Sequence, residues 1–104
     1  MAIGGDRESR LSSRSTVREI MSRYDIHFKK SLGQNFLTDE HVLQKIVQAA
    51  ALDEHSGVLE IGPGIGALTQ ALAESAGKVV AVEIDGKLIP VLTDLFRPYD
   101  HVTI

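Results

Sequence analysis

The stretch that most constrains the fold is a glycine-rich turn between an apolar run and a helical pattern. The run GVLEIG ends at Gly62, and IGALTQALAESAG after it has the apolar spacing of an amphipathic helix. Gly62, Gly64 and Gly66 stand at alternate positions, where glycine permits a sharp turn and lets a ligand approach the bare backbone. This pattern predicts a strand, a tight loop and a helix, with a ligand at the loop.

A second apolar run repeats the arrangement. KVVAVEID reads as a strand, and its continuous apolar character is typical of a parallel strand covered on both faces. GKLIPVLTDLF predicts a helix with Pro90 near its first turn, and HVTI opens a third strand. Strand, helix, strand, helix, strand at this spacing predicts an α/β fold. It would hold the first three strands of a doubly wound parallel sheet, a Rossmann-like arrangement with right-handed crossovers.

The chain before this sheet divides into two parts. Residues 1–14 are rich in Gly, Ser and Arg and are predicted to form a flexible basic arm. Residues 15–37 are expected to hold a short amphipathic helix and then a loop. Residues 38–104 are assigned to the sheet domain, which begins with a second helix. Because the sequence stops in the third strand, we expect it to be the N-terminal part of a longer protein.

Short polar signals predict where the helices begin and end. Thr16 and Glu19 offer a capping box for the first helix. Thr38 is a good N-cap for the second helix, which is expected to end near Leu52. Gly77 follows the helix after the glycine loop and is expected to be its C-cap.

Charge is distributed unevenly along the chain. Residues 1–37 hold seven Lys and Arg against four Asp and Glu, a net charge of +3, whereas residues 38–104 hold four against ten, a net of −6. A basic N-terminal part ahead of an acidic body suggests a polyanion partner. The chain has no cysteine, no secretory signal pattern and no apolar run of membrane-spanning length, so we expect a cytoplasmic protein without a membrane partner. The four histidines are too widely spaced for a local metal motif, and no metal site is predicted.

Acidic residues decide between two ligand classes for the glycine loop. Glu83 closes the second predicted strand, 21 residues after Gly62, where doubly wound folds place a carboxylate that accepts ribose hydroxyls. A nicotinamide dinucleotide would bring a diphosphate close to Glu60, Glu83 and Asp85, without a nearby cation. S-adenosylmethionine has no phosphate and carries a sulfonium and an ammonium group, so the acids favour a methyltransferase. The dinucleotide alternative stays open.

Three motifs together resemble a known family. FKKSLGQNFL (Phe28–Leu37), VLEIGPGIGALT (Val58–Thr69) and VVAVEID (Val79–Asp85) are similar, in this order and spacing, to the ribosomal RNA adenine dimethyltransferases of the KsgA/Erm type. The resemblance runs from about residue 15 to the end and is closer to the KsgA branch. It implies an enzyme of ribosome assembly that uses S-adenosylmethionine to dimethylate two adjacent adenosines near the 3′ end of small-subunit ribosomal RNA.

The resemblance also implies roles for individual residues. Asn35 and Leu37 would contact S-adenosylmethionine from a strap formed by Phe28–Leu37. Gly62 would offer backbone at the glycine loop, and Glu83 would hold the ribose. Within the strap, Lys29 and Lys30 would face RNA phosphate.

One part of the family pattern is missing. Members carry an Asn-Leu-Pro-Tyr type motif that holds the target adenine, and this motif would lie beyond Ile104. We therefore assign no catalytic residue and expect the chain to be inactive alone. Its expected partner is small-subunit ribosomal RNA or a precursor of the 30S subunit, and it is expected to be a monomer. Two other classes stay open: a fragment of a nicotinamide-dependent oxidoreductase, and a non-catalytic module for RNA binding or ribosome assembly.

Overall fold

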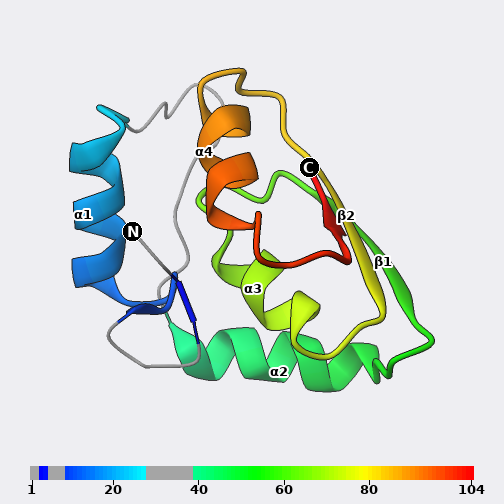
Figure 1. The fold of residues 1–104 in the computed structure, drawn as a ribbon. Coiled ribbons are helices and arrows are strands. Elements are labelled where there is room, and N and C mark those ends of the chain that lie inside the picture. Colours follow the sequence, from blue (N-terminus) through cyan, green and yellow to red (C-terminus); the bar gives the residue numbers. More distant parts are fainter. Residues whose placement is uncertain (1–2, 5–8, 28–38) are drawn as a thin grey trace.

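The computed structural model describes residues 3–4, 9–27 and 39–104 of the chain. These residues form four helices and three strands (Figure 1). In chain order the elements are α1 (Arg14–Arg23), α2 (Glu40–Ala50), β1 (Gly57–Ile61), α3 (Ala67–Ala73), β2 (Lys78–Val82), α4 (Leu88–Leu95) and β3 (Val102–Thr103). The predicted alternation of strands and helices from Gly57 onward is confirmed.

The strands form one parallel sheet in the order β1-β2-β3. Val58 on β1 is opposite Val79 on β2, and Val79 is also opposite Val102 on β3. The first and second connections, through α3 and α4, each return to a parallel neighbour, as the α/β prediction requires. The carboxyl ends of β1 and β2 therefore meet at one edge of the sheet.

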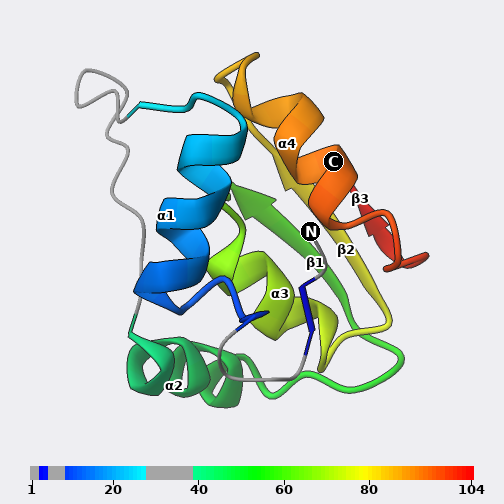
Figure 2. The same cartoon turned by 60° about the vertical axis from the view of Figure 1, so that its left-hand side comes forward.

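The helices lie on one side of this sheet (Figures 1 and 2). Apolar residues from every helix meet there with the inward residues of β1 and β2 in a single core. Its large, fully buried apolar members are Leu11, Ile20, Leu43, Ile65, Leu88, Leu92 and Val79. Among the described residues, no helix is long and apolar enough to cross a membrane.

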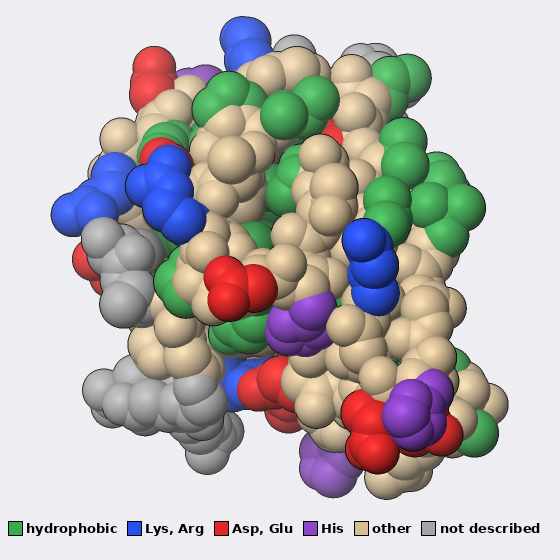
Figure 3. Space-filling model, turned by 45° about the vertical axis from the view of Figure 1, so that its right-hand side comes forward, with side chains coloured by type: hydrophobic (Ala, Val, Ile, Leu, Met, Phe, Trp, Pro, Cys, Tyr) green, Lys and Arg blue, Asp and Glu red, His purple; other side chains and the backbone are tan. Residues whose placement is uncertain are grey.

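The opposite face of the sheet is exposed. Large apolar side chains on this face keep between half and four fifths of their surface accessible: Leu59 66%, Ile61 73%, Val82 50% and Ile84 81%. Hydrophobic side chains gather on the strand side of the molecule in Figure 3. The prediction that β2 is covered on both faces is therefore wrong for this chain, in which one face alone is covered.

Part of the predicted basic arm is packed against the body. The Leu11 side chain is fully buried, and its backbone N–H donates to Oε1 of Gln70 on α3 at 3.0 Å. Both terminal nitrogens of Arg10 donate to the carboxylate of Glu74, at 2.8 and 2.6 Å. Residues 10 and 11 thus differ from the flexible segment expected over 1–14, because they contact residues far away in the sequence.

Two helices begin at residues other than those predicted. Ser13, not Thr16, is the N-cap of α1, and Thr16 lies within the helix with 1% of its surface exposed. Asp39 is the N-cap of α2, where its Oδ1 accepts from the N–H of His41 at 3.0 Å. Thr38, the predicted cap, lies outside the described residues. In each case a neighbouring polar residue caps the helix.

Gly77 is a site of close packing and does not cap a helix. The helix α3 ends earlier than expected, with Glu74 as its C-cap. The N–H of Gly77 donates to the carbonyl of Ser56 at 2.9 Å. A Cβ at this position would lie 2.0 Å from the carbonyl oxygen of Glu54, so only glycine lets the two loops approach so closely.

Candidate functional site

The glycine loop connects β1 to α3 through three residues in the left-handed region. The φ angles of Gly62, Gly64 and Gly66 are 73°, 60° and 97°. The N–H of Gly62 donates to the carbonyl of Val82 at 2.8 Å, which holds the start of the loop against the end of β2. Side chains other than glycine rarely adopt such φ angles, and this explains the alternate glycines seen in the sequence.

The first and last glycines of the loop have different surroundings. A Cβ on Gly62 would meet no atom within 4 Å, so the backbone here borders open space. A Cβ on Gly66 would lie 2.6 Å from the ring of Phe96, which packs directly on the start of α3. Gly62 therefore leaves room for a ligand, whereas Gly66 serves the packing of the loop against α4.

Glu83 lies directly after β2 and is bound to the glycine loop. Its Oε1 accepts from the N–H of Gly64 at 3.1 Å, and its Oε2 accepts from the N–H of Asp85 at 2.9 Å. The side chain is half-buried. Two residues of the predicted site, Gly62 and Glu83, are thus brought to the same edge of the sheet, with the loop backbone between them.

Glu60 is a second acid near the loop, and it faces inward. It is 8% exposed, and its carboxylate accepts a hydrogen bond from the hydroxyl of Thr69 on α3. Burial raises the pKa of Glu60; the hydrogen bond from Thr69 opposes this increase, and the nearby charge of Glu83 adds to it. Glu60 therefore connects the end of β1 to the first turn of α3 and holds the loop between them.

Thr69 is a part of the site that the sequence prediction missed. It is completely buried although it is polar, and it supports Glu60 from the helix that the loop enters. A polar residue among the apolar residues of ALTQALA was the available signal. The periodicity of the helix does not reveal which acid this hydroxyl meets.

The strap that would complete the predicted site lies outside the described residues. This applies to Asn35 and Leu37, the predicted contacts with S-adenosylmethionine, and to Lys29 and Lys30, the predicted contacts with RNA. Their roles stay predictions.

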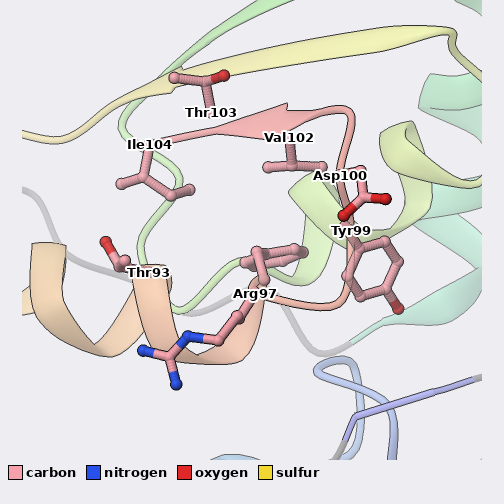
Figure 4. A pocket seen from close by; sticks show the side chains of 8 residues that line it. Thr93, Arg97, Tyr99, Asp100, Val102, Thr103 and Ile104 are labelled. Carbon is pink, nitrogen blue, oxygen red and sulfur yellow. The ribbon is translucent and has the colours of Figure 1, made fainter.

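A pocket of about 360 Å³ lies elsewhere, between the end of α4 and β3 (Figure 4). Its lining residues are Thr93, Phe96, Arg97, Tyr99, Asp100, Val102, Thr103 and Ile104. It includes neither the glycine loop nor Glu83, so we do not assign it to the candidate site. Within residues 3–4, 9–27 and 39–104, no group of three or more His, Cys, Asp or Glu side chains is placed to hold a metal ion.

Comparison with known proteins identifies relatives with a similar sequence. The family model for ribosomal RNA adenine dimethylase matches residues 26–104. A ribosomal RNA small subunit methyltransferase A from Streptococcus sanguinis (strain SK36) is 55% identical over 95 residues, which cover 91% of this chain and 33% of that protein. The protein of the same name from Geobacillus kaustophilus (strain HTA426) is 58% identical over 88 residues, which cover 85% of this chain and 30% of that protein. The chain thus spans about a third of the length of these curated relatives.

Solved structures agree with this relationship. The crystal structure of the 23S rRNA methyltransferase ErmE superposes with a TM-score of 0.63 and 36% identity, covering 66% of this chain and 28% of that one. A dimethyladenosine transferase from Plasmodium falciparum gives a TM-score of 0.58 and 34% identity, covering 62% and 25%. The three strands and their helices are therefore a partial Rossmann-like fold of the class I methyltransferase type, and the chain belongs to the ribosomal RNA adenine dimethylase family.

Proposed function

We propose that this chain is the cofactor-binding part of an S-adenosylmethionine-dependent ribosomal RNA adenine dimethyltransferase. The whole enzyme would act on two adjacent adenosines near the 3′ end of small-subunit ribosomal RNA, in a precursor of the 30S subunit in the cytoplasm. The observation that carries this proposal is the hydrogen bond between Gly64 of the glycine loop and Glu83 after β2, in a chain of this family.

The residues at this edge of the sheet suit S-adenosylmethionine. An ionised carboxylate offers about four acceptor positions, and Gly64 and Asp85 occupy two of those on Glu83. Two acceptor positions on Glu83 remain, one for each of the two ribose hydroxyls of S-adenosylmethionine. Gly62 borders open space, so a ligand can approach its backbone. The acids Glu60 and Glu83 suit a ligand that carries positive charge and no phosphate.

The chain contributes binding and orientation to the proposed reaction. S-adenosylmethionine supplies the methyl group as a sulfonium, and holding the reacting atoms in line is the main requirement of such a transfer. Glu83 and Gly62 would hold the nucleoside end, and Asn35 and Leu37 of the strap would contact the same ligand. We propose that the residues that hold the target adenine lie outside this sequence and that the 104-residue chain does not methylate RNA. Methylation of 30S subunits by the pure chain would disprove this inactivity.

The first prediction tests the role of Glu83. Glu83→Ala is expected to weaken S-adenosylmethionine binding by about 1.5–3 kcal/mol, which is the typical value of hydrogen bonds to a charged group. Isothermal titration calorimetry measures this change directly. Glu54→Ala is the control. The Glu54 side chain is exposed, and this substitution removes the same charge at a position away from the glycine loop.

Two further measurements make this test decisive. The N–H of Gly64 loses its acceptor in Glu83→Ala, so the variant could be destabilised. Thermal denaturation tests whether it is folded. NADH is titrated in parallel. Binding of NADH in preference to S-adenosylmethionine, or an unchanged affinity in Glu83→Ala, would disprove the assignment.

A further inference from the structure

Helix α1 carries two exposed arginines that have no ion-pair partner among the described residues. Arg14 and Arg18 are both exposed, and their separation of four residues places them on one side of the helix, about 6 Å apart along its axis. Neither forms an ion pair or a side-chain hydrogen bond with any residue in the described part of the chain. Two like charges at this spacing destabilise a helix by a few tenths of a kcal/mol.

Two other arginines of the described chain are used in ion pairs, whereas Arg23, in the last turn of α1, is exposed on another side of the helix, about 140° around from Arg18. Arg10 is largely buried and holds the carboxylate of Glu74, and Arg97 donates to Asp94 at 2.6 Å. Arg10, which the sequence grouped with the basic arm, is therefore not available to a partner. Within residues 9–27, the exposed arginines therefore all lie on α1.

The helix that carries these arginines is fixed to the body. Ser13 caps its first turn, and Val17 and Ile20 are buried in the core. At its other end the hydroxyl of Tyr24 donates to Asp94 on α4 at 3.3 Å. Arg14 and Arg18 are thus presented by an ordered, anchored element.

Charge complementarity indicates the kind of partner. The chain from residue 38 to 104 has six more acids than bases, so its net charge disfavours a polyanion. The arginine side of α1 carries the opposite charge. Ser22 follows Arg18 by four residues and is exposed on the same side of the helix, where its hydroxyl can donate to a phosphate oxygen. Glu19 lies about 100° around the helix from Arg18, away from the arginine pair.

We propose that this surface of α1, formed by Arg14 and Arg18 with Ser22, binds the phosphate backbone of RNA. The identity of that RNA as small-subunit ribosomal RNA rests on the proposed function, whereas the contact itself does not depend on cofactor binding. Contacts to phosphate position an RNA and carry no base specificity. The surface therefore orients the RNA substrate on the face that carries α1.

The second prediction tests this surface by its salt dependence. A fluorescently labelled RNA hairpin is titrated with the chain at several salt concentrations, and binding is measured by fluorescence anisotropy. Each phosphate contact contributes about 0.7–0.9 to the slope of log K against log salt concentration. The double variant Arg14→Gln/Arg18→Gln is expected to reduce this slope by about 1.4–1.8.

A charge-matched control separates position from net charge. Lys45→Gln/Lys78→Gln removes the same charge from α2 and from the start of β2, and is expected to leave the slope unchanged. An equal loss in both double variants, an unchanged slope in the arginine variant, or no RNA binding by the parent chain would each overturn the proposal. Calorimetric titration of the same samples with S-adenosylmethionine keeps the two proposals separate. A parent chain that binds RNA through Arg14 and Arg18 but not the cofactor would refute only the proposed function.

Discussion

Glu60 is a residue whose position has a thermodynamic cost. A carboxylate that loses water on folding is less stable than one in solvent unless its partners compensate. Here burial outweighs the hydrogen bond from Thr69, and the pKa of Glu60 is raised. The folded chain therefore binds a proton at pH values where the unfolded chain has released it. The free energy of unfolding contributed by this residue falls as pH rises from the ordinary pKa of glutamate through the raised pKa.

The third prediction follows from this pH dependence. Glu60→Gln keeps an oxygen that can accept from Thr69 and removes the charge. Above the raised pKa, the variant is expected to have a larger free energy of unfolding than the parent, because it carries no buried charge there. Below the ordinary pKa of glutamate, the difference between the two proteins is expected to disappear. Urea denaturation at a series of pH values measures the free energy of unfolding of both proteins. Subtracting the two values at each pH cancels the contributions of the other titrating groups.

An exposed residue provides the control for Glu60. Glu54→Gln changes the same chemical group at a position that is largely exposed, and is expected to leave stability nearly unchanged. A Glu60→Gln variant that is less stable than the parent at high pH would show that the charge on Glu60 stabilises the fold.

At the scale of elements, two loops approach each other closely at Gly77. The loop between α2 and β1 touches the loop between α3 and β2, through the carbonyls of Glu54 and Ser56 and the backbone of Gly77. The contact aligns the starts of β1 and β2, which pair from Gly57 and Lys78 onward. The parallel register is thus supported at its first residue pair by a backbone contact that admits no side chain.

The fourth prediction concerns this loop contact. Gly77→Ala places a Cβ 2.0 Å from a backbone oxygen and is expected to lower the free energy of unfolding by about 1–3 kcal/mol, as overpacking does elsewhere. Gly57→Ala is the matched control, because a Cβ there meets no atom within 4 Å. The control is expected to change stability by about 0.5 kcal/mol or less. Equal urea midpoints for the two variants would contradict this explanation of Gly77.

Elements could be predicted from the sequence more reliably than their ends. Strands and helices follow from apolar spacing, which is a local property, and the left-handed glycines signalled the loop because few other residues adopt those angles. The helix caps are local, but several neighbouring polar residues can fill each position. The role of Gly77, in contrast, depends on which segments meet in space. The contact of Arg10 with Glu74 joins residues 64 positions apart, and no local pattern indicates it. Likewise, no local pattern indicated that Thr69 would contact Glu60 at the candidate site.

The molecule as a whole has two unequal faces. One face of the sheet is covered by helices, and the other exposes large apolar side chains from β1 and from the end of β2. In the described chain β1 pairs only with β2, so the polar backbone groups of its outer edge are unpaired as well. Parallel sheets are normally covered on both faces, and exposed edges with apolar side chains favour association. This surface argues against the predicted monomer when the 104-residue chain is concentrated.

The fifth prediction tests this association. The molar mass of the chain, measured by light scattering during size-exclusion chromatography, is expected to increase with protein concentration. Leu59→Lys places a charge on the exposed face and is expected to reduce the increase. Ile89→Lys is the control. Ile89 is an exposed residue of α4, which lies on the other side of the sheet, and this variant is expected to behave like the parent. A parent chain that stays monomeric at every concentration would contradict the prediction.

The two backbone contacts to Glu83 have a consequence for the entropy of binding. A free glutamate side chain samples many rotamers, and ordering one costs up to about 2 kcal/mol. Gly64 and Asp85 already restrict this carboxylate through one hydrogen bond to each oxygen. A ligand that binds here therefore meets an acceptor whose rotamer was selected when the chain folded. Most of that ordering cost belongs to folding, and little of it reduces the affinity for the ligand.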